Sequence, residues 1–348
     1  MERPHTGVLL MNVGTPNSPR IPDVRRYLRQ FLGDPRVIDL PWLGRKLLVN
    51  GVIAPFRAPK SAKAYKELWT EGGSPLIVHG IALRDALRAE LGVGYRVELA
   101  MSYQEPSIQR GLDAFRTAGV QRVILLPLYP QYASSSTGAS LQAAFERIAE
   151  WNDIPAISTV PPFHRSEGYL AAFTERIQTC APDSFDHVLF SFHGLPERHI
   201  HRSHTACSGL LDNVPQKTPI SGCVCETKDT DQFPSCYKMQ CHSTARALAL
   251  RVGLQQGRWS VGFQSRLDSK WVRPFSDVRV KELAKSGCRR LLVVSPAFVA
   301  DCLETVIEIG EEYAEIFQEH GGQHLQLVPS LNATPRWVQA VADLVRKA

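Results

Sequence analysis

The sequence has 348 residues, of which 44% are hydrophobic, and a formal net charge of +6. This length exceeds what one small core needs and predicts two domains of ordinary size. Lysine and arginine are scattered without any long run of like charge, which argues against nucleic acid as the partner.

The N-terminal apolar run leads directly into a Gly-Thr-Pro turn and has no small-residue cleavage site behind it. It therefore predicts a strand and not a signal peptide. No stretch approaches the roughly 18 apolar residues that cross a bilayer. We expect a cytoplasmic protein, with peripheral attachment to the inner membrane as the alternative.

Short apolar runs alternate with helical periodicity along nearly the whole chain. Such uniformly apolar runs are typical of strands buried on both faces of a parallel sheet, and their alternation with helices predicts the α/β class. The predicted strands are VLLMNVG, RVELAMSY and RVILLPLYP, followed by HVLFSFHG, WSVGFQS, RRLLVVSPAF and HLQLVPSL.

The order of these runs repeats. Residues 8–16 align with 188–196, and residues 119–130 align with 287–298. The repeat predicts two similar Rossmann-like domains whose parallel sheets face a central cleft, although the dinucleotide fingerprint GxGxxG is missing. The expected domains are 1–160 and 161–348, with the last helix a candidate to pack back on the first domain.

Ligands in open parallel sheets bind beyond the carboxyl ends of the strands. The first repeat pair places Val13 and His193 at equivalent strand ends. His193 is therefore the first candidate for a functional residue. A hydrogen-bonded structural histidine is the alternative interpretation.

The second repeat pair gives two strands that each run into a polar loop and a helix. In the first loop, residues 134–137 read SSST, which predicts a helix cap and allows an anion site. In the second, an acidic stripe follows the strand, formed by Asp301, Glu304, Glu308, Glu311 and Glu315. The stripe indicates either a solvated helix face or ligands for a divalent cation.

Five motifs in this order carry a resemblance: GVLLMNVGTP, LYPQYASSSTG, LFSFHGLPERH, FQSRLDSKWVRPFSD and FVADCLETVIEI. The chain resembles the ferrochelatases, which insert ferrous iron into a porphyrin to make haem. The resemblance covers essentially the whole chain apart from residues about 204–235. It implies a porphyrin cleft between the two domains, with protoporphyrin IX and Fe²⁺ as substrates.

The resemblance implies that His193 and Glu304 are the catalytic pair. A free-base porphyrin must lose two pyrrole protons and accept a desolvated dication, so the site needs a base and a carboxylate. We favour His193 as the base, with Glu304 and then Glu308 passing metal or protons along the stripe.

The resemblance also implies the residues that contact the porphyrin. Trp271 is expected to pack on the macrocycle, and Arg29 and Arg266 are candidates for its propionates, with surface salt bridges as the alternative. Val13 is apolar where relatives that use coproporphyrin carry tyrosine, which favours protoporphyrin IX. Tyr132, in the YPQY segment, completes the set.

Residues 41–60, PWLGRKLLVNGVIAPFRAPK, correspond to a lip of the porphyrin site in the family. The segment interleaves large apolar residues with basic ones. It indicates either a surface that rests on a bilayer or a buried helix followed by a loop.

A cysteine-rich insertion occupies residues 204–241. Cys223, Cys225, Cys236 and Cys241 are enough for a tetrathiolate site, with Cys207 in reserve. In a reducing compartment, clustered thiols indicate metal and not disulfides. The spacing resembles the internal cluster insertion of certain bacterial ferrochelatases and implies a 2Fe–2S cluster. Zinc and a site without metal are the alternatives. Ser134 stands where animal enzymes carry a cluster cysteine, so a cluster of the animal type is not expected.

Two other functions compete with this interpretation. One is a chelatase that inserts another metal into another tetrapyrrole. The other is an iron–sulfur sensor or electron carrier built on a chelatase scaffold. His193 and Glu304 argue against the second, because a carrier has no use for them.

Overall fold

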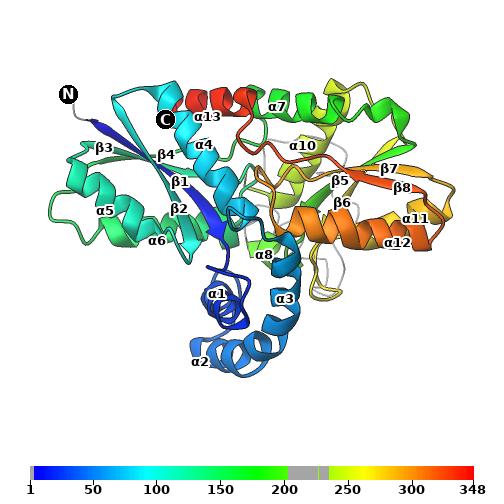
Figure 1. Cartoon of the computed structure of the whole chain (residues 1–348), viewed down its shortest axis with the longest axis horizontal. Coiled ribbons are helices and arrows are strands. Elements are labelled where there is room, and N and C mark those ends of the chain that lie inside the picture. Colours follow the sequence, from blue (N-terminus) through cyan, green and yellow to red (C-terminus); the bar gives the residue numbers. More distant parts are fainter. Residues whose placement is uncertain (1–3, 203–225, 227–234) are drawn as a thin grey trace. The chain divides into compact units, whose positions relative to one another are not determined.

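The computed structural model describes residues 4–202, 226 and 235–348 (Figure 1). The chain forms two compact units, and its C-terminal helix belongs with the N-terminal half. Unit 1 comprises Met1–Tyr129, Ala133–Pro161 and Asn332–Ala348, and unit 2 comprises Pro130–Tyr132 and Pro162–Leu331.

Unit 1 is built on four parallel strands in the order β2-β1-β3-β4. Eight of the nine residues of β1 are buried, as its uniformly apolar sequence predicts. β4 was not predicted from the sequence, because it is a four-residue edge strand with no buried residue. The strands are β1 (Thr6–Gly14), β2 (Tyr95–Tyr103), β3 (Arg122–Pro127) and β4 (Ala156–Thr159).

Helices cover both faces of this sheet, with α5 and α6 on one side and α4 and α13 on the other (Figure 1). Leu9 of β1 packs with Leu112 and Phe115 of α5 in the core. Gly7 permits this approach, since a Cβ there would lie 2.8 Å from the Phe115 ring. The helices are α1 (Ile21–Gly33), α2 (Trp42–Leu47), η1 (Leu48–Ile53), α3 (Ala54–Leu68), α4 (Pro75–Leu91), α5 (Ile108–Ala118), η2 (Ser134–Gly138), α6 (Ala139–Ile148) and α13 (Pro335–Lys347), of which η1 and η2 are π-helices.

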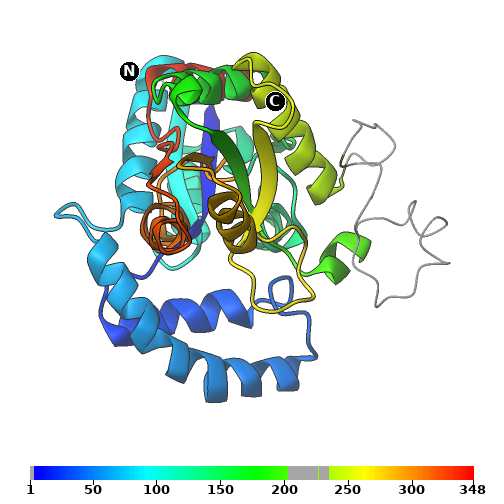
Figure 2. The same ribbon diagram turned by 90° about the vertical axis from the view of Figure 1, so that its right-hand side faces the viewer.

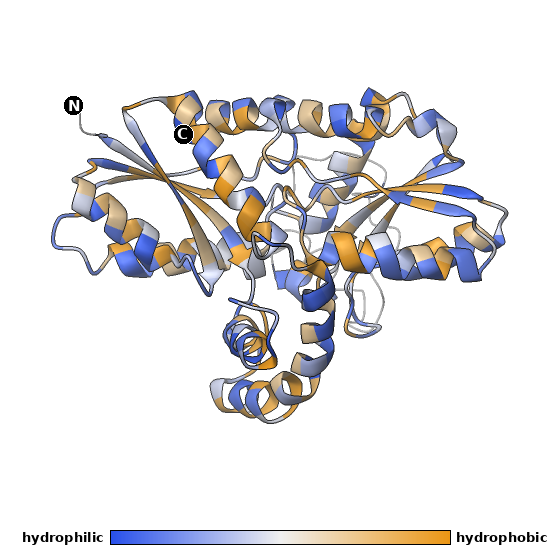
Figure 3. Cartoon of the chain, in the orientation of Figure 1, coloured by the Kyte–Doolittle hydropathy of each residue, from blue (hydrophilic) through white to orange (hydrophobic). Residues whose placement is uncertain are grey.

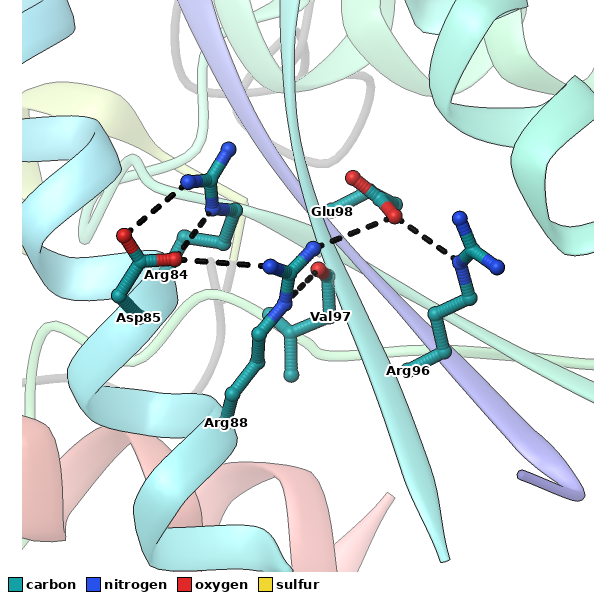
Figure 4. Close-up of polar contacts among 6 residues, drawn as sticks. All are labelled: Arg84, Asp85, Arg88, Arg96, Val97 and Glu98. Carbon is teal, nitrogen blue, oxygen red and sulfur yellow. Dashed lines mark hydrogen bonds and ion pairs between the residues drawn. The ribbon is translucent and has the colours of Figure 1, made fainter. Parts of the chain in front are cut away.

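An ion-pair network joins α4 to β2 (Figure 4). Arg88 pairs with Asp85 on its own helix at 3.5 Å and with Glu98 on β2 at 3.2 Å. Arg96 reaches the same Glu98 oxygen at 3.0 Å. Exposed pairs of this kind contribute about 0–1 kcal/mol each, so the network sets the orientation of α4 more than the stability of the unit.

The segment from α1 to α3 lies beyond the carboxyl end of β1 (Figures 1 and 2). Tyr27 of α1 meets Tyr65 of α3 with ring centroids 6.4 Å apart. Helix is continuous from Trp42 to Leu68, and the side chains of Trp42 and Phe56 are 64% and 79% exposed. The alternative expectation for residues 41–60, a buried helix followed by a loop, is therefore wrong.

Unit 2 repeats the plan of unit 1. Its strand order is β6-β5-β7-β8, so β5 takes the place of β1. The predicted α/β class with two similar parallel sheets is confirmed, and apolar residues dominate the central strands of each (Figure 3). The strands are β5 (His187–His193), β6 (Trp259–Gln264), β7 (Arg290–Val294) and β8 (His324–Leu327).

The described helices of unit 2 include one long π-helical segment, η5, which continues into α12. The predicted helix that begins near residue 302 is therefore present, but its first nine residues wind as a π-helix. The helices are α7 (Glu167–Gln178), the 3₁₀-helix η3 (Pro182–Ser184), α8 (Glu197–Arg202), α10 (Tyr237–Arg251), α11 (Ser276–Lys285), η5 (Glu304–Glu312) and α12 (Tyr313–Glu319). Within the described ranges, no helix is long and apolar enough to cross a bilayer.

Candidate active site

His193 is the last residue of β5, where the strand-end rule places it. Its Nδ1 lies 2.6 Å from the carbonyl oxygen of Gly194. A carbonyl oxygen only accepts hydrogen bonds, so Nδ1 of the neutral ring carries the proton. The lone pair is then on Nε2, which makes that atom able to accept a proton.

Two half-buried aromatic rings flank His193. The Trp271 ring centroid lies 6.4 Å from that of His193, and the Phe298 centroid lies 6.2 Å from it. Gly194 brings the chain close to β6, because a Cβ there would lie 2.7 Å from the Gln264 carbonyl oxygen. Both rings are tilted against the imidazole, by 51° and 54°, so the imidazole lies next to aromatic surface.

The acidic stripe reaches this histidine through Gln264, the register partner of His193 on β6. Gln264 Nε2 donates to the main-chain oxygen of Glu304 at 3.0 Å and to a carboxylate oxygen of Glu308 at 3.4 Å. His193, Glu304 and Glu308 are thus gathered in one part of unit 2. π-Helices occur often at functional sites, and here the π-helix η5 carries both carboxylates.

The carboxylate of Glu308 accepts several hydrogen bonds. Ser265 donates its backbone N–H at 2.8 Å and its hydroxyl at 2.5 Å, and the Tyr313 hydroxyl donates at 3.1 Å. Burial nevertheless raises the pKa of the Glu308 carboxyl, and the hydrogen bonds from Ser265 oppose that rise. Ser265 achieves its two bonds with a φ of 62°, a left-handed conformation that is uncommon for serine.

Cys302 lies two residues before Glu304 and is buried. Burial raises the pKa of the thiol well above its usual value, and the Glu304 carboxylate, to which the thiol is hydrogen-bonded, raises it further. The thiol therefore stays protonated and donates its hydrogen bond to Glu304. The donor to the Glu304 carboxylate is thus a thiol, which forms weak hydrogen bonds. The donors to Glu308 are N–H and hydroxyl groups, which form stronger ones.

The helix that follows the cysteine-rich insertion contacts the backbone of His193. The hydroxyl of Tyr237, at the start of α10, donates to the His193 carbonyl oxygen at 2.7 Å. Cys236 is the N-cap residue of that helix, and its sulfur accepts from the Met239 N–H at 3.3 Å. Cys241 is fully buried next to Tyr237.

Three of the cysteines named from the sequence, Cys207, Cys223 and Cys225, lie outside the described residues. Among the residues that the structure describes, no three histidine, cysteine, aspartate or glutamate side chains form a group able to hold a metal ion.

The other predicted contacts with the porphyrin are spread along the chain. Arg266 pairs with Asp277 at 2.6 Å and stacks on Phe275, while Arg29 is exposed. Val13 and Tyr132 are half-buried.

The SSST loop departs from its expected role as a cap. Ala133 takes the N-cap position of η2, without a side-chain bond. Ser134 instead accepts a hydrogen bond from Arg36 at 2.8 Å. The expected capping by residues 134–137 is therefore wrong.

Four residues around His193 were not predicted as part of the site from the sequence: Phe298, Gln264, Ser265 and Tyr237. Gln264 and Ser265 close the strand WSVGFQS, so the strand-end rule that selected His193 also applies to them. Phe298 ends the SPAF run after β7 in the same way. Tyr237 had no comparable signal, because its partner is a backbone atom 44 residues earlier.

The chain is similar to proteins of known name over nearly its full length. A sequence model of the ferrochelatase family matches residues 5–348. The ferrochelatase of Pseudomonas paraeruginosa is 45% identical over 341 residues, which cover 97% of this chain and 96% of that protein. The ferrochelatase of Pseudomonas fluorescens is 43% identical over 342 residues, covering 98% and 97%.

Solved structures share the fold at much lower identity. SirB from Bacillus subtilis with Fe³⁺ superposes with a TM-score of 0.52 at 13% identity, covering 98% of this chain and 94% of that one. The cobalt complex of sirohydrochlorin chelatase SirB from Bacillus subtilis subspecies spizizenii gives a TM-score of 0.53 at 11% identity, with the same coverage. The family match over nearly all residues and the identity to its named members lead to one conclusion: this chain belongs to the ferrochelatase family.

Proposed function

We propose that this protein inserts ferrous iron into protoporphyrin IX to give protohaem, the last step of haem biosynthesis. Family membership supports metal insertion into a porphyrin. The single observation that carries the chemistry is the hydrogen bond from His193 Nδ1 to Gly194, which leaves Nε2 as a base beside the two carboxylates of η5.

His193 Nε2 takes a proton from a pyrrole nitrogen in this proposal. Two pyrrole protons leave the macrocycle as Fe²⁺ enters, so charge is conserved at the porphyrin: His193 takes them in turn, passing the first to the Glu308 carboxylate before it accepts the second. Trp271 and Phe298 pack against the ring and hold it next to the imidazole. Aromatic faces suit this role, because stacked ring systems attract one another beyond the effect of burial.

Glu304 is the proposed ligand that brings iron to the porphyrin. Its only described side-chain partner is the weak thiol donor of Cys302, so binding Fe²⁺ costs it little hydrogen bonding. Glu308, with its strong donors from Ser265 and Tyr313, is less free to take a metal ion and is proposed to hold iron only in passing.

The direct test is an anaerobic assay of the purified protein with protoporphyrin IX and Fe²⁺. We expect the free-base absorption bands to disappear as haem forms. The same assay with Co²⁺ or Ni²⁺ separates a ferrochelatase from a chelatase for another metal. No turnover with Fe²⁺ would contradict the proposal.

Protoporphyrin IX is the proposed substrate because Val13 places an apolar, half-buried side chain at the end of β1. The other proposed contacts are Arg29, Tyr132, Arg266 and Trp271. Competition between equal concentrations of protoporphyrin IX and coproporphyrin tests the choice. A higher kcat/KM for coproporphyrin would contradict it.

A 2Fe–2S cluster in the cysteine-rich insertion is the proposed resident cofactor. The donor set of Cys223, Cys225, Cys236 and Cys241 supplies four thiolates. Cys236 fits the role, since an N-terminal position on a helix and an N–H···S bond both favour the thiolate form. Cys207 is the alternative to the buried Cys241 as fourth ligand.

The described part of the insertion is anchored to α10. Glu226 pairs with the buried Lys238, and its carbonyl oxygen accepts from Arg246 at 2.8 Å. These contacts are on the first three turns of the helix whose Tyr237 holds the His193 backbone. The cluster is therefore proposed to stabilise this part of unit 2 and not to perform the reaction.

Replacing Cys236 with serine should remove the cluster. Protein purified anaerobically should contain about two iron and two sulfide ions per chain, and the variant should contain neither. Cys288→Ser, a buried thiol near β7, is the matched control and should keep both. Comparing Cys241→Ser with Cys207→Ser identifies the fourth ligand. A colourless native protein with bound zinc and no sulfide would establish the zinc alternative.

The exposed face of α2, η1 and α3 is the proposed contact with a membrane surface. Its large side chains Trp42, Leu43, Leu47, Val52 and Phe56 are each more than half exposed. Hydrophilic residues lie among them along these helices (Figure 3). The Lys46 ammonium lies over the Trp42 ring, 4.8 Å from its centroid. Interfacial helices combine these two features, with apolar burial and attraction to anionic lipid acting together.

The double substitution Trp42→Ser and Phe56→Ser should abolish flotation with anionic liposomes at low salt. Each large apolar side chain that enters the interface contributes about 1.5–3 kcal/mol, so loss of two should shift the protein to the soluble fraction. Val93→Ser, which removes another exposed apolar side chain of unit 1, should leave flotation unchanged. Native protein that fails to float would contradict the proposal.

A further inference from the structure

Gln264 is a buried and fully hydrogen-bonded polar side chain near His193. It is 1% exposed. Its Oε1 accepts from Ser191 at 2.8 Å and from Ser295 at 3.3 Å, and its Nε2 donates to the Glu304 main-chain oxygen and the Glu308 carboxylate. All four hydrogen-bonding positions of the amide are therefore used.

The orientation of this amide follows from its partners. The Glu304 carbonyl and the Glu308 carboxylate only accept hydrogen bonds, so the NH₂ group must face them. The oxygen then faces the two serine hydroxyls, which can donate. A flipped amide would place oxygen against oxygen at both contacts with η5.

Gln264 consequently links the two sources of catalytic groups. Ser191 lies on β5 two residues before His193, and the Gln264 backbone oxygen accepts from the Gly194 N–H at 2.8 Å. On the other side, the amide holds the first turn of η5. One buried side chain, Gln264, thus connects β5, which carries His193, to η5, which carries the two carboxylates.

Unit 1 provides an internal comparison. Met101 and Phe263 occupy equivalent places, because each donates its backbone N–H to a proline carbonyl in the loop that follows its strand. The next residue is Ser102 in unit 1 and Gln264 in unit 2. The short side chain of Ser102 forms a hydrogen bond with the Ser140 hydroxyl at 2.7 Å. Of the two units, only unit 2, which carries His193, therefore has a long amide side chain at this position.

We propose that Gln264 is a positioning residue for metal insertion, which fixes the carboxylates of η5 at a set distance from His193. This inference rests on the proposed function, since it assumes that Glu304 handles the iron. Displacing a reacting group by about 1 Å costs up to roughly 100-fold in rate. The amide is hydrogen-bonded to the Glu304 backbone, so its loss should let Glu304 move relative to His193.

The test compares Gln264→Met with native protein and with Ser260→Ala. Methionine has a similar volume and makes none of the four hydrogen bonds. Ser260 lies on the same strand, and its hydroxyl bonds to His187 Nε2 at 2.8 Å, far from the strand end. Each variant is measured for kcat, for KM of Fe²⁺, for porphyrin affinity by fluorescence quenching, and for Tm.

We expect Gln264→Met to lower kcat/KM for Fe²⁺ by about 10- to 100-fold while porphyrin affinity stays near native. Ser260→Ala should lower Tm and leave both kinetic constants near native. If Gln264→Met does not fold, Ser191→Ala, which removes one donor to the amide, should lower kcat/KM by a smaller factor. Near-native kinetics in every Gln264 and Ser191 variant, with an active native protein, would overturn the inference. An inactive native protein would instead overturn the proposed function.

Discussion

Replacing His193 with alanine should reduce kcat for iron insertion by about 10²- to 10⁴-fold, the usual contribution of a positioned general base. The change removes Nε2, the proton acceptor that the bond from Nδ1 to Gly194 leaves available. KM for Fe²⁺ should stay near native, because the carboxylates of η5 keep their contacts with Gln264 and Ser265. Anaerobic turnover with protoporphyrin IX measures both constants.

His187→Ala is the matched control for this change. His187 lies at the other end of β5, where burial, together with the charges of Arg279 and Arg258, lowers its pKa to about 4. It is neutral at the pH of the assay, so its removal changes no charge. We expect a lower Tm and near-native turnover. A His193→Ala protein that turns over within a few-fold of the native rate would remove the assignment of His193 as base.

Most of the fold was predictable because its strands are buried on both faces. β1 and β5 read as continuous apolar runs, and their repeat along the chain predicts two units with one strand order, which the structure has. β4 was not predicted, because its sequence AIST is short and none of its residues is buried. A strand that buries no side chain leaves little hydrophobic pattern in a sequence.

The π-helical winding of η5 could not be predicted from its acidic spacing. Glutamates at intervals of three and four fit an α-helix as well as the start of a π-helix, and the choice depends on tertiary contacts. In this protein Gln264 bonds the first carbonyl of η5, and Ser265 and Tyr313 hold Glu308. These partners are distant in sequence, so no local pattern records them.

Some residues of the candidate site could likewise be predicted from the sequence, and others could not. His193 follows from the rule that ligands bind at the carboxyl ends of parallel strands. The roles of Gln264 and Tyr237 depend instead on which atoms face them in the folded unit. A glutamine at a strand end carries no functional signal in the sequence. Only the four hydrogen-bond partners of Gln264 show that it connects β5 to η5.

Replacing Glu304 with glutamine should lower kcat/KM for Fe²⁺ by roughly 100-fold, mainly through a higher KM. The substitution keeps the size of the side chain and removes the negative charge, and a neutral amide is a far weaker ligand for a hard dication. The Glu304 main-chain oxygen keeps its bond to Gln264, so the helix should stay in place. Turnover as a function of Fe²⁺ concentration gives the two constants separately.

Glu311→Gln, an exposed position farther along the same helix, is the control for a general loss of acidic charge and should remain near native. The pattern of constants also assigns the roles within the catalytic pair. A base whose loss lowers kcat and a ligand whose loss raises KM for Fe²⁺ are distinguishable. If Glu304→Gln lowered kcat alone while His193→Ala raised KM, the two roles would have to be exchanged: Glu304 would accept the protons, and His193 would deliver the iron.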